Sequence, residues 1–384
     1  MLGRKIALSL ASVIATVAAC EGLLRLWWCG PGHDRIEFQS RPFLCANPYW
    51  GTWHFPNNAL QHRQSCFDVH YRTNEFGMKG DPVRSDRTHI ALLGDSFIEG
   101  LGNDNETTVD HFMTERLDSQ HDVLNFGVSG GFSTIDELVL YDDFVRFFHP
   151  RIVVLFFLNY NDLRDNLQPS KQSYIDRDLN FVYPKATSFQ EVVSQVQEQR
   201  PGGEPGTDVA PILCLSRLLR FAEKVFRDQF QMKFDIMWDV RAELAKPYLA
   251  DEDAETQRAW RIVDASLGKL QAITENEGTT LVVVQIADPF QVDKNWLRVS
   301  SAWMRQPLDP IHPNRRLGEI CRRRGIHYYD MYPDVTRYIE EHDLHFPYLS
   351  FRCDRHYTPR GQELMANLVV GYLREQGLVP AITP

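Results

Sequence analysis

Five short apolar runs, separated by helical patterns, place the strongest constraint on how this chain folds. The runs are nearly continuous, with no polar residue at every second position, and the first of them begins at His89. Such runs are typical of strands in a parallel sheet that is covered on both faces. The five runs are residues 89–93, 122–126, 151–158, 280–287 and 326–330.

Helical periodicity fills the stretches between these runs, and the alternation predicts an α/β fold. The expected helices cover residues 106–117, 135–148, 255–275 and 315–324. A last helix is expected from Pro359 towards Glu375, because Thr358 suits an N-cap and proline suits the first helical position. We therefore expect a three-layer α/β/α domain, doubly wound around a mostly parallel, five-stranded sheet of flavodoxin-like type.

The sequence divides into three expected segments. Residues 1–29 form an N-terminal anchor or signal, residues 30–87 an irregular extension with a few strands, and residues 88–384 the α/β domain. An insertion at about 168–246 interrupts that domain. It contains a loop rich in proline and glycine and an amphipathic segment at 213–230, for which we expect a lid.

The N-terminus has the pattern of an export signal or a membrane anchor. Arg4 and Lys5 precede an uncharged run that ends at Cys20, which is shorter than the roughly 20 apolar residues of a bilayer span. The apolar pattern continues to Trp28, so we favour an uncleaved anchor. The residues before Cys20 also resemble a lipoprotein processing site, in which case Cys20 carries the lipid. Both alternatives place the rest of the chain outside the cytoplasm, in the periplasm or at the cell surface.

Charge and cysteine content exclude some partners. The formal net charge of −10 argues against nucleic acid, since phosphate binding needs clustered Lys and Arg. The sequence has neither a CxxC pair nor an HExxH motif, so we expect no metal site. The seven cysteines fit an exported chain. Cys45 and Cys66 lie close together in a turn-rich segment and are the disulfide that we favour, although sequence alone leaves the connectivity open.

Polar residues interrupt the pattern at the ends of the first three strands and before the last helix. Functional groups of open α/β sheets gather beyond the carboxyl ends of the strands, so each interruption is a candidate site. The four interruptions are Gly94-Asp95-Ser96, the stretch from Asn125 to Gly131 that contains Ser129, Asn159-Tyr160-Asn161-Asp162, and Asp354-Arg355-His356.

Two serines compete for the role of nucleophile. The stretch GVSGG around Ser129 matches the GxSxG elbow of α/β-hydrolases, with a strand before it and a helix after it. In that fold several strands precede the strand that leads into the elbow, whereas here one clear parallel strand, at 89–93, does so. We therefore favour Ser96, with Ser129 as the rival.

The motifs GDSF, NFGVSGG, NYND and DRH, in this order, resemble those of the SGNH/GDSL hydrolase family. The resemblance runs from about Tyr71 to the C-terminus and is closest to the membrane-anchored bacterial members, with YRTNEFGMKG before the first strand. It implies the SGNH hydrolase fold. It also implies that Ser96 is the nucleophile and that His356 is the general base that activates it.

The same resemblance assigns the remaining site residues. Asp354 would orient His356, and the oxyanion would meet the backbone N–H groups of Ser96 and Gly130 and the side-chain amide of Asn161. Asp95 would shape the turn that presents the nucleophile. Asp162 would brace the third loop.

Two positions depart from the family pattern. Cys353 stands three residues before His356, where the family usually has Asp, and Asp354 stands two residues before it. If Asp354 points away, Ser96 and His356 act as a dyad. Asn159 replaces the usual glycine of the third motif, whereas Asn161 keeps its place.

The resemblance implies a serine esterase without a cofactor. It would remove or transfer a small acyl group, by preference acetyl, on an extracytoplasmic carbohydrate through an acyl-serine intermediate; hydrolysis and transfer are both open. One alternative is a lipid esterase or thioesterase, which a lid at 213–230 would favour. The other is a non-catalytic carbohydrate-binding or assembly protein on the same scaffold. Protein partners and oligomeric state are not predicted.

Overall fold

The computed structural model describes residues 12–13, 15–23, 38–64, 66–168, 171, 174–200 and 242–381. Residues 15–23 are helical. In the part of the chain that is described, no helix has both the length and the apolar character to cross a membrane. Much of the predicted anchor at 1–29, and all of the amphipathic segment at 213–230, lie outside the described residues.

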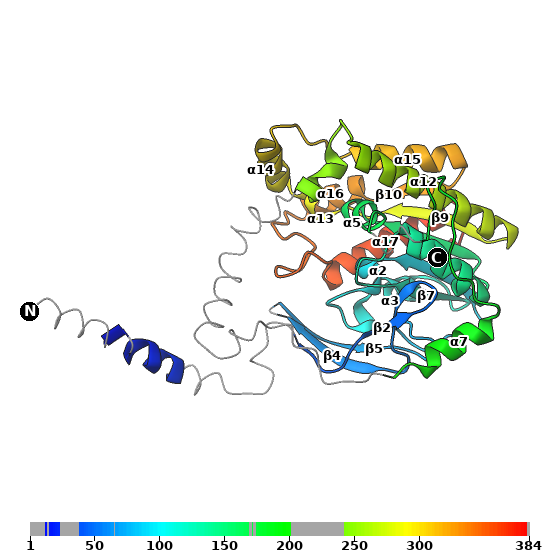
Figure 1. Cartoon of the computed structure of the whole chain (residues 1–384), viewed down its shortest axis with the longest axis horizontal. Coiled ribbons are helices and arrows are strands. Elements are labelled where there is room, and N and C mark those ends of the chain that lie inside the picture. Colours follow the sequence, from blue (N-terminus) through cyan, green and yellow to red (C-terminus); the bar gives the residue numbers. More distant parts are fainter. Residues whose placement is uncertain are drawn as a thin grey trace, which may run out of the picture.

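A five-stranded, all-parallel sheet forms the centre of the molecule, with the strand order β10-β9-β8-β6-β7 (Figure 1). The chain starts inside the sheet at β6, pairs β7 on one side, and returns to place β8 on the other side. The order therefore reverses next to β6, where ligand sites of such sheets form. All five predicted strands are confirmed. They are β6 (Thr88–Gly94), β7 (His121–Gly127), β8 (Ile152–Phe157), β9 (Thr280–Gln285) and β10 (His327–Asp330).

Alternate side chains of the strands face two helical layers, as the predicted three-layer fold requires. In β6, Ala91 and Leu93 pack with α4, α12 and α15, whereas Ile90 and Leu92 pack with α3, α16 and α17. The helices are α2 (Ser96–Glu99), η1 (Asn105–Thr107), α3 (Val109–Arg116), α4 (Thr134–Asp143), η2 (Val145–Phe148), α5 (Asn159–Asp165), α7 (Phe189–Glu198), α11 (Ala242–Ala245), η4 (Lys246–Tyr248), α12 (Ala254–Asn276), α13 (Pro289–Val292), α14 (Lys294–Met304), α15 (His312–Arg324), α16 (Tyr332–Glu341) and α17 (Pro359–Glu375).

Two of the predicted helices are each divided into a 3-10 helix and an α-helix. The predicted helix at 106–117 divides into η1 and α3, and the one at 135–148 divides into α4 and η2. Thr358 and Pro359 occupy the N-cap and the first position of α17, as predicted. The Thr358 hydroxyl donates to the Leu349 carbonyl oxygen at 2.9 Å and makes no cap hydrogen bond. Its side chain thus ties the helix start to the preceding loop.

The N-terminal extension is more regular than predicted and shares the main core. It contains a three-stranded antiparallel sheet, β1-β4-β5, and a β2-β3 hairpin. Trp50 and Trp53 are 0 % and 1 % exposed and pack in the same hydrophobic cluster as α4 and α12. The strands are β1 (Phe38–Gln39), β2 (Leu44–Asn47), β3 (Gly51–His54), β4 (Ala59–Gln64) and β5 (Phe67–Arg72).

The predicted Cys45–Cys66 disulfide is wrong. Cys66, at the turn between β4 and β5, is bonded to Cys353, which is 287 residues away in the sequence. Cys45 is a free thiol on β2, and its Sγ lies 3.5 Å from the Trp53 carbonyl oxygen. Proximity in sequence was a poor guide because closing a long loop costs only slightly more entropy than closing a short one. The tertiary packing of the β4-β5 turn decides the pairing.

Candidate active site

Ser96 lies at the carboxyl end of β6, where the strand turns directly into α2. Asp95 is the N-cap of that helix, and its Oδ1 accepts a hydrogen bond from the Phe97 N–H at 2.9 Å. The turn is so tight that a Cβ on Gly94 would lie 2.4 Å from Ile98 Cγ1. Strand, cap and glycine together present the Ser96 hydroxyl at the edge of the sheet.

His356 reaches Ser96 from the loop before α17. Its Nε2 lies 2.6 Å from Ser96 Oγ, and the Phe97 ring packs against the imidazole at 4.8 Å between ring centres. On the other side of the ring, Nδ1 is hydrogen-bonded to Asp354 Oδ1, which also accepts from the His356 backbone N–H at 3.3 Å. The structure therefore brings together serine, histidine and aspartate in the connectivity of a catalytic triad.

Electrostatics in the triad favour an ionised Asp354 and a basic His356. Burial lowers the pKa of His356, but the charge and hydrogen bond of Asp354 outweigh burial, so the pKa is raised. Burial conversely raises the pKa of Asp354, and the charge and hydrogen bond of His356 outweigh it, so the pKa is lowered. A base with a raised pKa, held next to a hydroxyl, can take the hydroxyl proton.

The oxyanion loop, which we define as Ser129–Gly131 after β7, lies beside this triad. Gly130 has φ +95°, a conformation that side-chain-bearing residues rarely adopt. Among the backbone hydrogen bonds of the described residues, none has the Gly130 N–H as its donor.

Asn161 lies in the first turn of α5, after β8, and its amide is already engaged. The amide nitrogen donates to Asp95 Oδ2 at 2.7 Å, and the amide oxygen accepts from Arg164 at 2.8 Å. An amide nitrogen carries two hydrogens, so one remains for a substrate oxygen. Arg164 and Asp95 thereby fix the orientation of the Asn161 amide, a contact that the sequence motifs did not indicate.

Carboxylates gather beneath the site. Asp162 Oδ2 accepts from the Leu158 N–H at 2.7 Å and so holds the third loop. Glu137 of α4 is fully buried, and neither of its carboxyl oxygens has a hydrogen-bond partner among the described residues. Burial raises its pKa well above the usual value, and the charges of Asp162 and Asp95 add to the effect. Glu137 went unnoticed in the sequence because nothing in an amphipathic helix pattern marks a carboxylate as buried.

Ser129, the rival nucleophile, has a different environment. Its backbone N–H donates to Glu99 Oε2 at 2.6 Å, whereas His356 makes its hydrogen bond to the hydroxyl of Ser96. The elbow-like GVSGG sequence thus forms the loop beside the triad. Among the described residues, no group of three or more His, Cys, Asp or Glu side chains is arranged to hold a metal ion.

Comparison with known proteins yields matches among solved structures alone. No protein-family model and no curated protein sequence matches the chain. The chain is similar to a lipase/acylhydrolase from Enterococcus faecalis, with 13% identity, coverage of 77% of this chain and 100% of the other, and a TM-score of 0.38. It is also similar to a catalytic mutant of an acetylxylan esterase from Geobacillus stearothermophilus, with 11% identity, coverage of 77% and 97%, and a TM-score of 0.38.

A third similar structure, from Desulfitobacterium hafniense, is described as a putative lipolytic protein of the G-D-S-L family. Its identity is 10%, its coverage is 75% of this chain and 100% of the other, and its TM-score is 0.35. The neighbours thus carry the names of ester-cleaving enzymes, among them the GDSL family that the motifs resemble. Since the identities and TM-scores are low, the function proposed below rests on the geometry of the site.

Proposed function

We propose that this chain is a serine esterase of the SGNH/GDSL type. The observation that carries the proposal is the contact of 2.6 Å between Ser96 Oγ and His356 Nε2, with Asp354 on the opposite ring nitrogen. Ser96 and His356 are 260 residues apart in the sequence, so only the folding of the chain brings the three groups together. Their place at the carboxyl edge of a parallel sheet is where such sheets carry their sites.

The reaction follows from these contacts. Ser96 Oγ attacks the ester carbonyl carbon while His356 Nε2 takes the hydroxyl proton, and the imidazolium is stabilised by Asp354. The negative charge that develops on the carbonyl oxygen is stabilised by hydrogen bonds from the Gly130 N–H and the Asn161 amide. Collapse breaks the carbon–oxygen bond to the alcohol, which leaves with the proton from His356. Water then attacks the acyl-serine with His356 as base, which releases the acid and restores Ser96.

For the substrate we propose a small acyl ester, by preference an acetyl ester, on a carbohydrate outside the cytoplasm. The resemblance of the motifs supports this class. The Cys66–Cys353 disulfide supports an oxidising compartment, because cytosolic disulfides are rare. The anchor predicted at 1–29 remains part of this proposal. A fusion of the C-terminus to a reporter that is active only outside the cytoplasm tests the location.

A lipid esterase or thioesterase is the second candidate, because a cavity of about 240 Å³ lies along α5, the helix that carries Asn161. Its lining includes the apolar residues Leu163, Leu167, Pro247 and Ala259. A series of p-nitrophenyl esters from acetyl to dodecanoyl separates the two candidates. A preference for acetyl supports the carbohydrate esterase, and a preference for long chains supports the lipid enzyme.

Fluorophosphonate labelling tests whether the chain is a serine hydrolase at all. We expect labelling of the wild type and of Ser129→Ala, and none of Ser96→Ala, because of these two serines it is Ser96 whose hydroxyl contacts His356 among the described residues. Labelling that survives Ser96→Ala and disappears in Ser129→Ala would assign the nucleophile to the elbow instead. If the wild type neither reacts with the probe nor hydrolyses any ester, the non-catalytic alternative holds.

A further inference from the structure

A buried pair in the N-terminal part of the chain connects the extension to the oxyanion loop. His54, at the end of β3, and Glu99, at the end of α2, are both 0 % exposed. His54 Nε2 lies 3.0 Å from Glu99 Oε2, and His54 Nδ1 lies 3.0 Å from the Gly77 carbonyl oxygen. Glu99 Oε2 also accepts the hydrogen bond from the Ser129 N–H at 2.6 Å.

These contacts fix the peptide that precedes the Gly130 N–H. Two successive glycines, Gly130 and Gly131, have φ of +95° and +84°, so the oxyanion loop has little conformational restraint of its own. An oxyanion donor is effective only when it is held in place before the reaction. Glu99 Oε2, which accepts the hydrogen bond from the Ser129 N–H, supplies that restraint from α2, the helix that also begins with the nucleophile.

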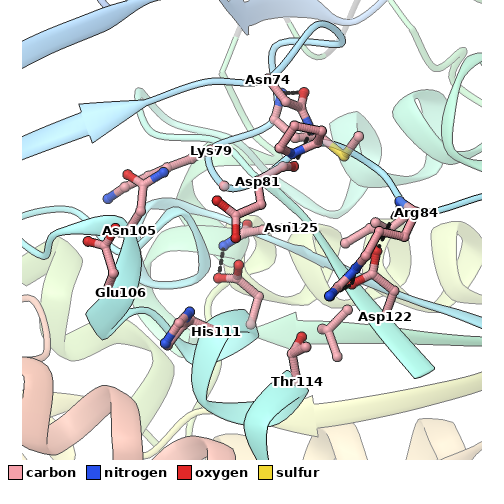
Figure 2. Close-up of a pocket in the computed structure, with 16 residues that line it drawn as sticks. Asn74, Lys79, Asp81, Arg84, Asn105, Glu106, His111, Thr114, Asp122 and Asn125 are labelled. Atoms are coloured by element: carbon pink, nitrogen blue, oxygen red, sulfur yellow. Dashed lines mark hydrogen bonds and ion pairs between the residues drawn. The ribbon is translucent and has the colours of Figure 1, made fainter. Parts of the chain in front are cut away.

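The charge of Glu99 is retained in this buried position. Burial raises its pKa, but the hydrogen bond and charge of His54 and the charge of Lys79 outweigh burial, so the pKa is lowered. Lys79 follows β5 and is 2 % exposed; its Nζ donates to the Gly100 and Asn103 carbonyl oxygens, just after α2. Figure 2 shows Lys79 at the crevice between the extension and β7. An ionised carboxylate is a strong acceptor for the Ser129 N–H.

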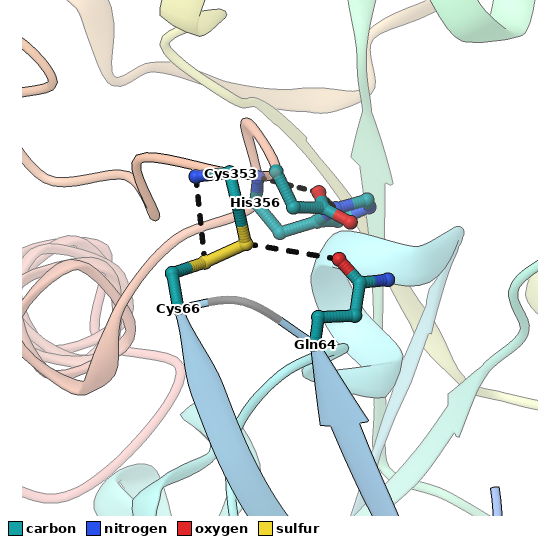
Figure 3. Close-up of a disulfide and its surroundings, with 5 residues drawn as sticks. Gln64, Cys66, Cys353 and His356 are labelled. Atoms are coloured by element: carbon teal, nitrogen blue, oxygen red, sulfur yellow. Dashed lines mark hydrogen bonds and ion pairs between the residues drawn. A yellow bond between two sulfur atoms is a disulfide. The ribbon is translucent and has the colours of Figure 1, made fainter. Parts of the chain in front are cut away.

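The extension also reaches the loop that carries the base. The Cys66–Cys353 disulfide joins the β4-β5 turn to the residue directly before Asp354, and Figure 3 shows the bond next to His356. The Phe67 and Phe351 rings pack beside it at 5.4 Å between centres. The Phe351 N–H donates to the His356 carbonyl oxygen at 2.8 Å, which closes the loop on itself. The covalent bond therefore acts on a short loop that holds two of the three triad members.

We propose that the N-terminal extension is a positioning part of the active site. His54 and Glu99 hold the oxyanion loop, and the Cys66–Cys353 disulfide holds the loop of Asp354 and His356. Neither contact touches a reacting atom, so these are positioning residues. The inference rests on the proposed esterase function and deepens it, because it gives the extension a role in the rate of acyl transfer.

Glu99→Ala and Glu99→Gln test the first contact. Glu99→Ala removes the acceptor for the Ser129 N–H, so we expect kcat for p-nitrophenyl acetate to fall about 10²-fold, the scale of one oxyanion donor, with little change in KM. Glu99→Gln keeps an oxygen acceptor, so we expect it to retain most of kcat. Glu340→Gln removes an exposed ion pair with Lys294, between α14 and α16, and is the matched control, with wild-type kcat. A wild-type kcat in Glu99→Ala, or an equal loss in Glu99→Gln, would overturn the proposal.

The disulfide is tested in the folded wild type by mild reduction, which avoids variants that fail to fold. We expect a lower kcat that returns on reoxidation, and the same lower kcat in the Cys66→Ser, Cys353→Ser double variant. Full activity of the reduced protein would contradict this half of the proposal.

Amide hydrogen exchange separates failure of this inference from failure of the proposed function. We expect exchange at Ser129–Gly131 to accelerate in Glu99→Ala and exchange at residues 351–356 to accelerate on reduction, whether or not the protein turns over an ester. Unchanged exchange at both places would refute the positioning role even in an active enzyme. An inactive wild type with these exchange changes would refute the esterase and leave the contacts established.

Discussion

Replacement of Asp354 by Asn tests whether the chain uses a triad or a dyad. Two N–H groups, the ring Nδ1–H and the backbone N–H of His356, point at the same oxygen of Asp354. An asparagine will therefore place its amide oxygen there, because the amide nitrogen would face two donors. The substitution preserves the geometry and the ring tautomer, and it removes the charge alone.

The magnitude follows from the lost attraction between the carboxylate and the imidazolium that forms during the reaction. The His356 and Asp354 side chains are 19 % and 20 % exposed, so solvent screens the pair incompletely. With charge centres ~4 Å apart and an effective dielectric constant of about 20, the attraction is about 4 kcal/mol. A tenfold change in rate corresponds to about 1.4 kcal/mol, so we expect kcat to fall about a thousandfold.

The pH profile supplies a second, independent readout. Catalysis needs neutral His356, and Asp354 raises the pKa of that histidine. Loss of the charge lowers this pKa, so the acid limb of the profile moves to lower pH while the plateau falls. The assay is steady-state hydrolysis of p-nitrophenyl acetate across the pH range. Asp343→Asn is the control, because it removes a carboxylate just after α16 whose side chain is 93 % exposed.

A plateau kcat within a few fold of wild type in Asp354→Asn, with the acid limb unmoved, would refute this reasoning. Ser96 and His356 would then act as a dyad, and Asp354 would serve only to shape the loop.

Four further substitutions have expected outcomes. Asn161→Ala should lower kcat about 10²- to 10³-fold in steady-state kinetics with little change in KM, and an unchanged kcat would remove this amide from the oxyanion site. Gly127→Ala should lower the free energy of unfolding by ~1–3 kcal/mol in urea, since the new Cβ would lie 2.2 Å from the Glu99 backbone nitrogen. Gly371→Ala, in α17 with nothing within 4 Å of its Cβ, should raise it by ~0.5–1 kcal/mol; equal effects at the two glycines would contradict the packing. Glu137→Gln should flatten the dependence of the free energy of unfolding on pH above the ordinary glutamate pKa of 4.5. In the wild type, burial raises the pKa of Glu137, so the folded chain holds this proton more tightly than the unfolded chain does. The free energy of unfolding of the wild type therefore falls as pH rises. Identical pH dependences of the wild type and Glu137→Gln would show that Glu137 does not titrate in this way.

The amino-acid sequence by itself determined the α/β class, the five strands and the four polar breaks that carry the site. These features are local, because a continuous apolar run such as 280–287 predicts a buried strand from its own residues. The sequence motifs also placed Ser96, Gly130, Asn161 and His356 at strand or helix ends, which the structure brings to one edge of the sheet.

Groups that meet only through folding were beyond the sequence. His54 and Glu99 are unremarkable in their own segments and form a buried pair only because β3 packs on α2. The pairing of Cys66 with Cys353, rather than with Cys45, depends on how the β4-β5 turn meets the loop before α17. The orientation of Asp354 was open for the same reason.

The physical distinction is between local and long-range contacts. Strand and helix patterns are determined by neighbours a few residues apart, and the chain displays them directly. Contacts such as Ser96 with His356, across 260 residues, or Cys66 with Cys353, across 287, depend on the packing of whole layers. Sequence therefore determined which chemical groups this protein has at its strand ends, and tertiary structure alone decided which partner each of them meets.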